Sequence, residues 1–302
     1  MQSLSRGWSF LSEAWKMAFA DKDLIKPSIY ALFAGFFVTL VFVVPIGISV
    51  LLFGTNGIIA RVVLGFFGIL LVFAQYFVTY LFSAMTVYLI YGYLSEGDGR
   101  MDKAWAMVQR EWLNILSLAA ASTLVNLIRG AVRGNGRNRN PLRVWIAELI
   151  SAVWTEATFL VLPAMVIEDA NLAIGLKRAT YIARNNLLLI GISTVGVGWI
   201  TGAIGFVLAI VGLVLGGGLA FLIINLGGTS VPVIVVAVVL GVLLGAIPFM
   251  LASVINTYTS TAYHTCLFLW ARDVEKSRAG QQAGIPVQIA APAPLAAVLG
   301  QL

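Results

Sequence analysis

Long apolar runs separated by short polar links dominate the pattern of the chain. Windows of about 17 to 25 residues identify helices that can cross a hydrocarbon core of about 30 Å. Six spans are predicted, at about residues 25–53, 61–94, 113–128, 143–167, 187–215 and 231–269. Because a helix satisfies its own backbone hydrogen bonds in lipid, the pattern predicts an all-α, polytopic transmembrane helix bundle.

Three of these spans need comment on length. The segment 113–128, "LNILSLAAASTLVNLI", is short and only moderately apolar, so it either crosses the membrane or forms a re-entrant segment. Segments 61–94 and 231–269 are longer than a bilayer requires and are expected to tilt, kink or project into water. Pro45 and Pro248 are the natural kink positions.

Three polar links have the spacing of amphipathic helices that lie at the membrane interface. In the helix expected at 3–20, one face carries Leu4, Trp8, Leu11, Trp15 and Ala18. The link 102–112 begins at a capping Asp102 and places Trp105, Val108 and Trp112 on one side. In the third link the apolar arc comprises Leu172, Leu176, Ala179, Ile182 and Ala183. Each link precedes an apolar hairpin, so we expect three weak architectural repeats that begin near residues 3, 101 and 170.

Composition and charge support this class and suggest an orientation. Hydrophobic residues make up 60% of the chain and charged residues 11%, whereas soluble domains carry about 25% charged residues. Four Lys or Arg lie in residues 1–26 and three each in 95–112, 168–186 and 272–278, the stretch after the last span, against six in the links on the other side. The positive-inside rule therefore predicts cytoplasmic N- and C-termini. The link 129–143 carries five arginines and no acid; either it is translocated, or segment 113–128 does not cross.

The basic links indicate contact with anionic lipid headgroups rather than with nucleic acid. The residues expected to make these contacts are Lys177, Arg178, Arg184, Arg133, Arg137 and Arg139. Cys266 and His264 are the single cysteine and histidine, which excludes an intramolecular disulfide and disfavours a metal site. We expect no cofactor. The N-terminus lacks the pattern of a cleaved signal peptide and is expected to be retained, in a prokaryotic cytoplasmic membrane.

Residues 1–278 are thus predicted to form one integral membrane domain, followed by a tail at 279–302. The tail is rich in Ala, Pro, Gly and Gln, a composition typical of flexible segments. Its apolar end, "PLAAVLGQL", is the alternative: a segment that docks on a partner.

Glu156 is the ionisable residue that most needs an explanation, because it lies near the middle of span 143–167. An intramembrane acid is by default a candidate functional residue. The alternative is a protonated or hydrogen-bonded glutamate that holds helices together. The further candidates for an intramembrane polar site are Gln75, Asn126, Asn256, Tyr258 and His264. Glu148, two turns earlier, is expected to pair with Arg143 or Arg129 at the outer rim.

No motif indicates an enzyme. The glycines of "GLVLGGGLAFLIINLGGTS" lack the Lys-Ser/Thr of a phosphate loop and predict a flexible turn or close helix packing. No nucleophile elbow, zinc-protease motif or catalytic triad pattern is present in the sequence.

Several short motifs resemble a prokaryotic family of polytopic membrane proteins of unknown function. The similar positions are Arg6, Trp8, Asp21, Lys22, Asp23, Leu24, Thr158, Phe159, Pro163, Glu168, Lys177 and Arg178. Where that family often has Gly-Pro before the basic pair, this chain has Asn171 and Leu172. The resemblance implies six spans and a prokaryotic membrane, and it implies no activity.

Two hypotheses of function follow. The first is a non-enzymatic membrane-organising or complex-forming subunit, with a homo-oligomer or another membrane protein as partner, in part through the C-terminal tail. The alternative is a small-molecule, ion or lipid transporter that uses Glu156 and the polar face of the last span.

Overall fold

A computed structural model describes residues 2–54, 57–134, 140–185, 187–282, 291–292 and 294–296. Within these residues the chain is helical and contains no strand. The elements are α1 (Gln2–Ala20), the 3-10 helix η1 (Lys22–Leu24), α2 (Lys26–Phe53), α3 (Ile58–Glu96), α4 (Met101–Arg133), α5 (Pro141–Ile167), α6 (Leu172–Asn185), α7 (Leu187–Gly227) and α8 (Val231–Gln282). Six of them are long and apolar enough to cross a membrane. The prediction of an all-α bundle with about six spans is confirmed.

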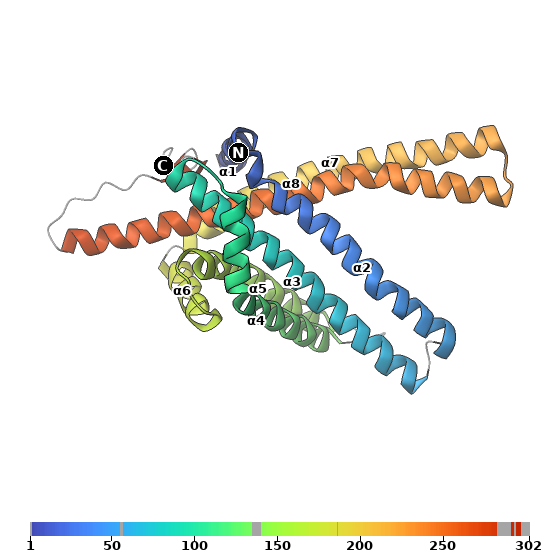
Figure 1. The fold of residues 1–302 in the computed structure, drawn as a ribbon, viewed down its shortest axis with the longest axis horizontal. Coiled ribbons are helices and arrows are strands. Elements are labelled where there is room, and N and C mark those ends of the chain that lie inside the picture. The colour runs from blue at the N-terminus through green and yellow to red at the C-terminus, as the bar shows by residue number, and fades with distance from the viewer. Residues whose placement is uncertain are drawn as a thin grey trace.

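The long helices form three consecutive hairpins, α2–α3, α4–α5 and α7–α8, which meet at one end of the molecule (Figure 1). The buried core lies at that end and combines α1, the second half of α3, the first half of α4, the end of α5, α6 and α8. The α2–α3 and α7–α8 arms diverge from this core, and the apolar side chains at their tips are exposed: Leu51 is 86% exposed and Leu226 is 89% exposed. Lipid tails are as apolar as leucine, so a bilayer can solvate these arms without further protein packing.

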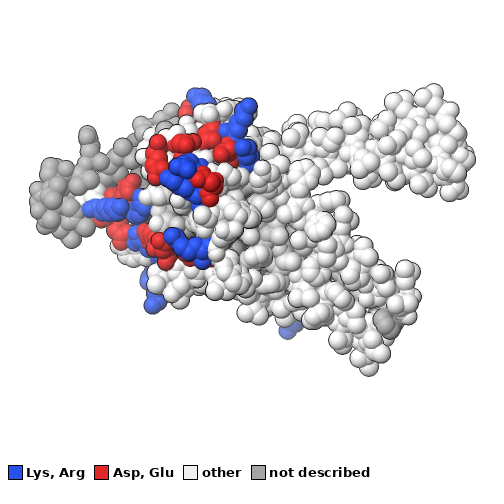
Figure 2. All heavy atoms as spheres, viewed as in Figure 1, with Lys and Arg blue, Asp and Glu red and all other residues white. Residues whose placement is uncertain are grey.

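Charged side chains gather at the packed end of the molecule. In Figure 2 the Lys, Arg, Asp and Glu residues cluster around α1 and α6, whereas the two projecting arms are free of them on the visible face. This separation is the one that a bilayer imposes, because a charged side chain in the hydrocarbon costs several kcal/mol, about 2.5–3.5 on insertion scales. The arms are therefore the part of the fold that suits the membrane interior.

Prolines start helices and also occur inside them. Asn140 caps α5 by accepting a hydrogen bond from the Leu142 amide at 3.0 Å, and Pro141 occupies the first turn, where its missing N–H has no cost. Pro45, Pro163 and Pro248 lie within continuous helices. None of these three therefore ends its helix.

The expected interfacial helices differ from the structure in two respects. α1 and α6 are separate helices, but residues 102–112 are the first turns of α4 and not a separate element. In α1 the buried residues include Phe10, Ala14 and Met17, while Trp8 is 60% exposed. The Phe10 ring packs edge-on against Tyr263 of α8, with centroids 5.2 Å apart. Leu11 and Ala18 of the predicted apolar face are buried as well. The buried face therefore overlaps the predicted one and extends beyond it, because α1 packs against α7 and α8.

Asp21 joins the start of α2 to the link between α3 and α4. One carboxylate oxygen accepts the Asp23 amide at 2.9 Å, and the other accepts the Gly99 amide at 2.7 Å. A Cβ atom at Gly99 would lie 2.7 Å from Leu24 Cδ1 and 2.8 Å from Asp21 Oδ2, so a larger residue would displace both side chains. The Asp-Lys-Asp-Leu motif is therefore a structural joint.

The α7–α8 hairpin is held by close approach of glycines. A Cβ atom at Gly212 would lie 2.6 Å from the Gly245 carbonyl oxygen, and one at Gly241 would lie 2.6 Å from the Gly216 carbonyl oxygen. Two small-xxx-small pairs thus face each other across the antiparallel helices, the arrangement that lets membrane helices pack backbone to backbone. Of the two alternatives for this glycine-rich region, close packing describes these four positions.

The segment from Glu168 to α6 is an electrostatic joint. Arg178 forms ion pairs with Glu168, at 3.1 Å, and with Glu275 of α8. Burial disfavours the Arg178 charge, but its hydrogen bonds to Glu168 and Glu275 outweigh burial and raise its pKa above the ordinary arginine value. In the described part of the tail, Leu295 is 1% exposed and belongs to the core. At least this point of the tail therefore packs on its own chain.

Candidate functional site

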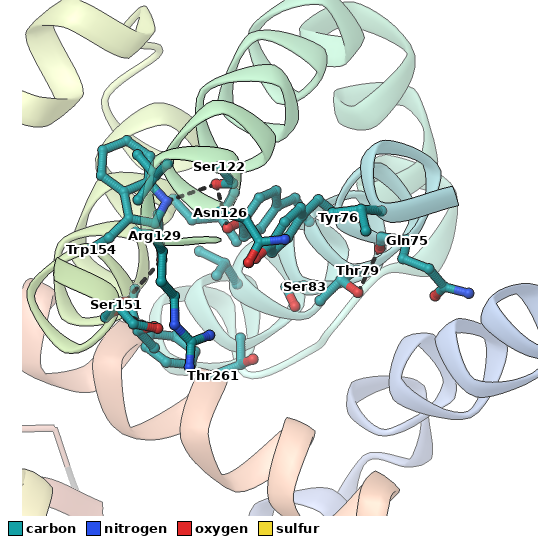
Figure 3. Close-up of a pocket in the computed structure, with 18 of the residues that line it drawn as sticks. Gln75, Tyr76, Thr79, Ser83, Ser122, Asn126, Arg129, Ser151, Trp154 and Thr261 are labelled. Atoms are coloured by element: carbon teal, nitrogen blue, oxygen red, sulfur yellow. Dashed lines mark hydrogen bonds between the residues drawn. The ribbon is translucent and has the colours of Figure 1, made fainter. Parts of the chain in front are cut away.

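A cavity of about 580 Å³ lies among α3, α4 and α5, and Thr261 of α8 contributes to its wall (Figure 3). Each helix supplies side chains at i, i+3, i+4 or i+7, so one face of each helix is turned inward. The polar wall residues are Gln75, Tyr76, Thr79, Tyr80, Ser83, Ser122, Asn126, Arg129, Ser151, Thr155, Thr158 and Thr261. Apolar residues, among them Leu71, Val72, Val87 and Leu162, complete the wall.

A hydrogen-bond network at Ser122 ties the three helices together beside this cavity. The Ser122 hydroxyl accepts from the Trp154 indole N–H at 2.9 Å and shares a hydrogen bond of 2.7 Å with the Tyr80 hydroxyl. Polar groups within a bilayer need such partners, since no water replaces them. The network fixes the relative rotation of α3, α4 and α5 and thereby the shape of the cavity.

Arg129 belongs to the cavity wall near the end of α4, and its charged cluster with Arg133 and Glu148, which are not wall residues, is here called the rim. Arg129 donates two hydrogen bonds to Glu148, at 2.9 and 2.8 Å, and Arg133 lies 3.6 Å from the same carboxylate. The pairing of Glu148 with Arg129 was one of the two expected; Arg133 takes the place expected for Arg143. Two positive charges share one negative charge, so the rim carries a net positive charge.

Glu156 lies beside the cavity, between α5 and α8, and faces His264. Its Oε2 atom is 3.5 Å from His264 Nε2, and neither atom has a hydrogen-bond partner among the described residues. The side chain of His264 is 6% exposed and that of Glu156 is 44% exposed. On the other side of the imidazole ring, Nδ1 forms a hydrogen bond of 2.7 Å with the Ser260 carbonyl oxygen.

The six predicted intramembrane polar residues fall in three places. Gln75 and Asn126 belong to the cavity wall, although the Gln75 amide points towards α2 (Figure 3), where it donates to the Gly35 carbonyl and Thr39 hydroxyl at 2.8 Å each. Glu156 and His264 form the pair described above.

Tyr258 and Asn256 lie away from both features. Tyr258 is fully buried at the packed end, where its hydroxyl donates to the Ala14 carbonyl of α1 at 2.9 Å. Its ring also packs against Trp15, with centroids 5.5 Å apart. Asn256 is exposed. The polar face expected along the last span therefore contributes only Thr261 to the cavity wall.

The residues predicted to contact lipid headgroups also lie in different places. Lys177 and Arg184 are exposed on α6, whereas Arg178 is occupied by its two glutamates. Arg133 belongs to the rim, and Arg137 and Arg139 lie outside the described residues.

Sequence reasoning missed Tyr80, Ser122 and Trp154. Serine and tyrosine are common in membrane helices, and nothing local marks these residues as partners. A usable signal existed in α4, where Ser122, Asn126 and Arg129 repeat at i, i+4 and i+7 within an apolar helix. Among the described residues no group of three or more His, Cys, Asp or Glu is arranged to hold a metal ion.

The fold and the cavity define a multi-pass helical membrane protein with a partly open space among its spans, lined by apolar and polar side chains. Comparison with protein-family models finds no match. Comparison with curated proteins finds no significant match either. The function is therefore argued from the cavity and its surroundings.

Proposed function

We propose that this protein is a small-molecule or lipid transporter that takes a single-chain amphiphile with an anionic headgroup into the cavity among α3, α4 and α5. The cavity is the observation that carries the proposal. Its volume of about 580 Å³ falls within the ~300–1,000 Å³ of small-molecule sites.

The length of the cavity suits an extended chain. Its wall runs from Leu71 to Val87 on α3, roughly 24 Å at ~1.5 Å per residue. That distance is most of the ~30 Å hydrocarbon thickness. Hydroxyl and amide groups alternate with apolar side chains along the wall, so both a polar group and a methylene chain find contacts there.

The rim favours a negative headgroup. Arg129 and Arg133 share Glu148, which leaves a net positive charge at the end of the cavity near the α4–α5 connection. Guanidinium groups bind phosphate and carboxylate in a planar, bidentate geometry. A headgroup that competes with Glu148 for Arg129 would be held at this rim while its chain lies along the cavity.

Orientation and location belong to the same proposal. The charged, packed end faces the cytoplasm, and the protein resides in a prokaryotic cytoplasmic membrane. The excess of Lys and Arg in the links at that end supports this orientation. Exposed Lys177 and Arg184 then contact anionic headgroups of the inner leaflet.

Ser151→Phe tests the proposal, because the new ring fills the cavity. Ala152→Phe is the matched control: the neighbouring residue is exposed and lies outside the cavity wall. Native mass spectrometry should find an amphiphile bound to the wild type and to the control but not to Ser151→Phe. In proteoliposomes, the wild type and Ala152→Phe should move a fluorescent lysophosphatidylglycerol between leaflets, and Ser151→Phe should not. Equal binding and flux in all three proteins would refute the proposal.

A complex-forming subunit is the second candidate, favoured by the α7–α8 arm. This arm projects beyond the other helices (Figure 1) and carries exposed apolar residues to its tip, such as Val231 at 73% exposure. Purification in mild detergent with mass spectrometry should then reveal a stoichiometric partner or a homo-oligomer. A monomer free of partners would contradict this candidate and leave the transporter untouched.

A further inference from the structure

We propose that Glu156 and His264 form an intramembrane proton-binding site that holds one proton between the two side chains, and that Phe159 couples this site to the cavity. The proton site stands on its own geometry. The coupling rests on the proposed function, because it requires a ligand in the cavity.

The orientation of the imidazole is set by the backbone of α8. His264 Nδ1 lies 2.7 Å from the Ser260 carbonyl oxygen, and a carbonyl can only accept, so Nδ1 carries a hydrogen. The other nitrogen, Nε2, is thereby left facing Glu156 Oε2 at 3.5 Å. Both facing atoms are buried and have no other hydrogen-bond partner among the described residues. A proton on either atom can serve both.

Charge balance favours one proton on the pair. With one proton the pair is neutral as a whole, either as a carboxylic acid beside a neutral imidazole or as a carboxylate beside an imidazolium. With no proton a carboxylate remains at membrane depth, and with two an imidazolium remains; each leaves an unpaired charge in a medium that solvates it poorly. The proton therefore belongs to the pair and not to either residue alone.

No third charge sets this balance. Among the side chains that the structure describes, no other acid or base lies within ion-pair distance of Glu156 or His264. The ionisable groups on the packed elements are one arginine, two phenols and a thiol. On α4, Arg129 lies in the same cavity wall as Phe159 and is paired with Glu148. On α8, Tyr263 packs edge-on against the imidazole at 5.1 Å and Cys266 is buried. On α3, the Tyr80 hydroxyl is engaged by Ser122.

Phe159 lies between the proton site and the cavity. Its ring stacks on the His264 imidazole with centroids 4.3 Å apart and planes within 7°, and the same residue belongs to the cavity wall. A ligand that displaces this ring also moves the imidazole relative to Glu156. By reciprocity, the change in ligand affinity on proton binding equals the change in proton affinity on ligand binding.

The first experiment needs no ligand. Because His264 is the single histidine, protein labelled with ¹⁵N-histidine and purified through a tag without histidine gives the signals of one imidazole. Between about pH 6 and 8, the Nε2 signal of the wild type should lie between the protonated and unprotonated positions, as for a shared proton. In Glu156→Gln it should move to the unprotonated position while Nδ1 keeps its hydrogen. Glu148→Gln, on the same helix but outside the pair, should match the wild type. An Nε2 signal unaltered by Glu156→Gln overturns the proton site.

The second experiment measures coupling, with lysophosphatidylglycerol as the probe because its phosphodiester stays singly charged over this pH range. Wild-type affinity should change with pH, by up to about tenfold per pH unit for one linked proton. Glu156→Gln should bind the probe without this slope. Phe159→Leu changes the cavity wall and with it the affinity itself, but that affinity should not vary with pH. A slope that survives in either variant overturns the coupling. If the wild type binds no probe at any pH, the proposed function and the coupling fall together, and the histidine signals alone decide the proton site.

Discussion

Replacing Gly212 with alanine should weaken the α7–α8 hairpin, and the structure supplies the magnitude. The new Cβ would lie 2.6 Å from the Gly245 carbonyl oxygen and 3.0 Å from the Phe249 ring. The obstacle is backbone, so the helices must move apart by several tenths of an ångström, and overpacking of this kind costs about 1–3 kcal/mol.

Gly217 provides the matched control on the same helix, because a Cβ there meets nothing within 4 Å. Gly217→Ala should be neutral or should stabilise α7 by up to about 1 kcal/mol, the helix-propensity gain of alanine over glycine. Gly212→Ala should therefore be less stable than Gly217→Ala by about 1–4 kcal/mol. Midpoints of SDS-induced unfolding, followed by tryptophan fluorescence, measure the difference. Equal midpoints for the two variants would refute the backbone contact between α7 and α8.

Three further predictions concern the packed end. Asp21→Ala removes the acceptor of two backbone amides and should lower the free energy of unfolding by about 1.5–3 kcal/mol. Asp23→Ala breaks only an exposed ion pair and should lower it by less than about 1 kcal/mol. Midpoints of SDS-induced unfolding compare the two variants. Arg178→Ala leaves two partly buried glutamates unpaired and should lower the thermal midpoint, while Arg184→Ala, on the exposed face, should leave it unchanged. Cys266 is fully buried, so a maleimide should label it only after unfolding; rapid labelling of the native protein would contradict the packing of α8.

Local patterns decided the helices and their distribution relative to the membrane. Hydropathy alone identifies the spans. A helix makes its own backbone hydrogen bonds, so any helix that is apolar over ~20 residues can cross the hydrocarbon core wherever it lies in the chain. The start of α5 is readable in Asn140 and Pro141, where capping chemistry acts over two or three residues. Glu156 could likewise be singled out from sequence, because a lone acid in an apolar span needs compensation wherever it lies.

The compensating partner could not be read in the same way. The polar residues of the last span offer Glu156 several candidate partners, and only the crossing of α5 and α8 selects His264 at 3.5 Å. The cavity is a stronger case. Tyr80, Ser122 and Trp154 lie far apart in the chain, and their hydrogen bonds depend on the rotation of three helices about their axes.

Membrane helices make such rotations hard to infer from hydropathy, because lipid and protein are nearly equal as apolar surroundings and the pattern does not mark which face packs. The same property of membrane helices explains why the predicted apolar face of α1 agrees only in part with the structure: Leu11 is buried but Trp8 is exposed, and Phe10 is buried against Tyr263 of α8. The sequence by itself thus determined the spans, the charged end and the presence of an acid needing a partner. The tertiary structure decided which polar groups meet, and with them the cavity and the paired Glu156 and His264, because those contacts arise from helix rotation and crossing rather than from any local signal.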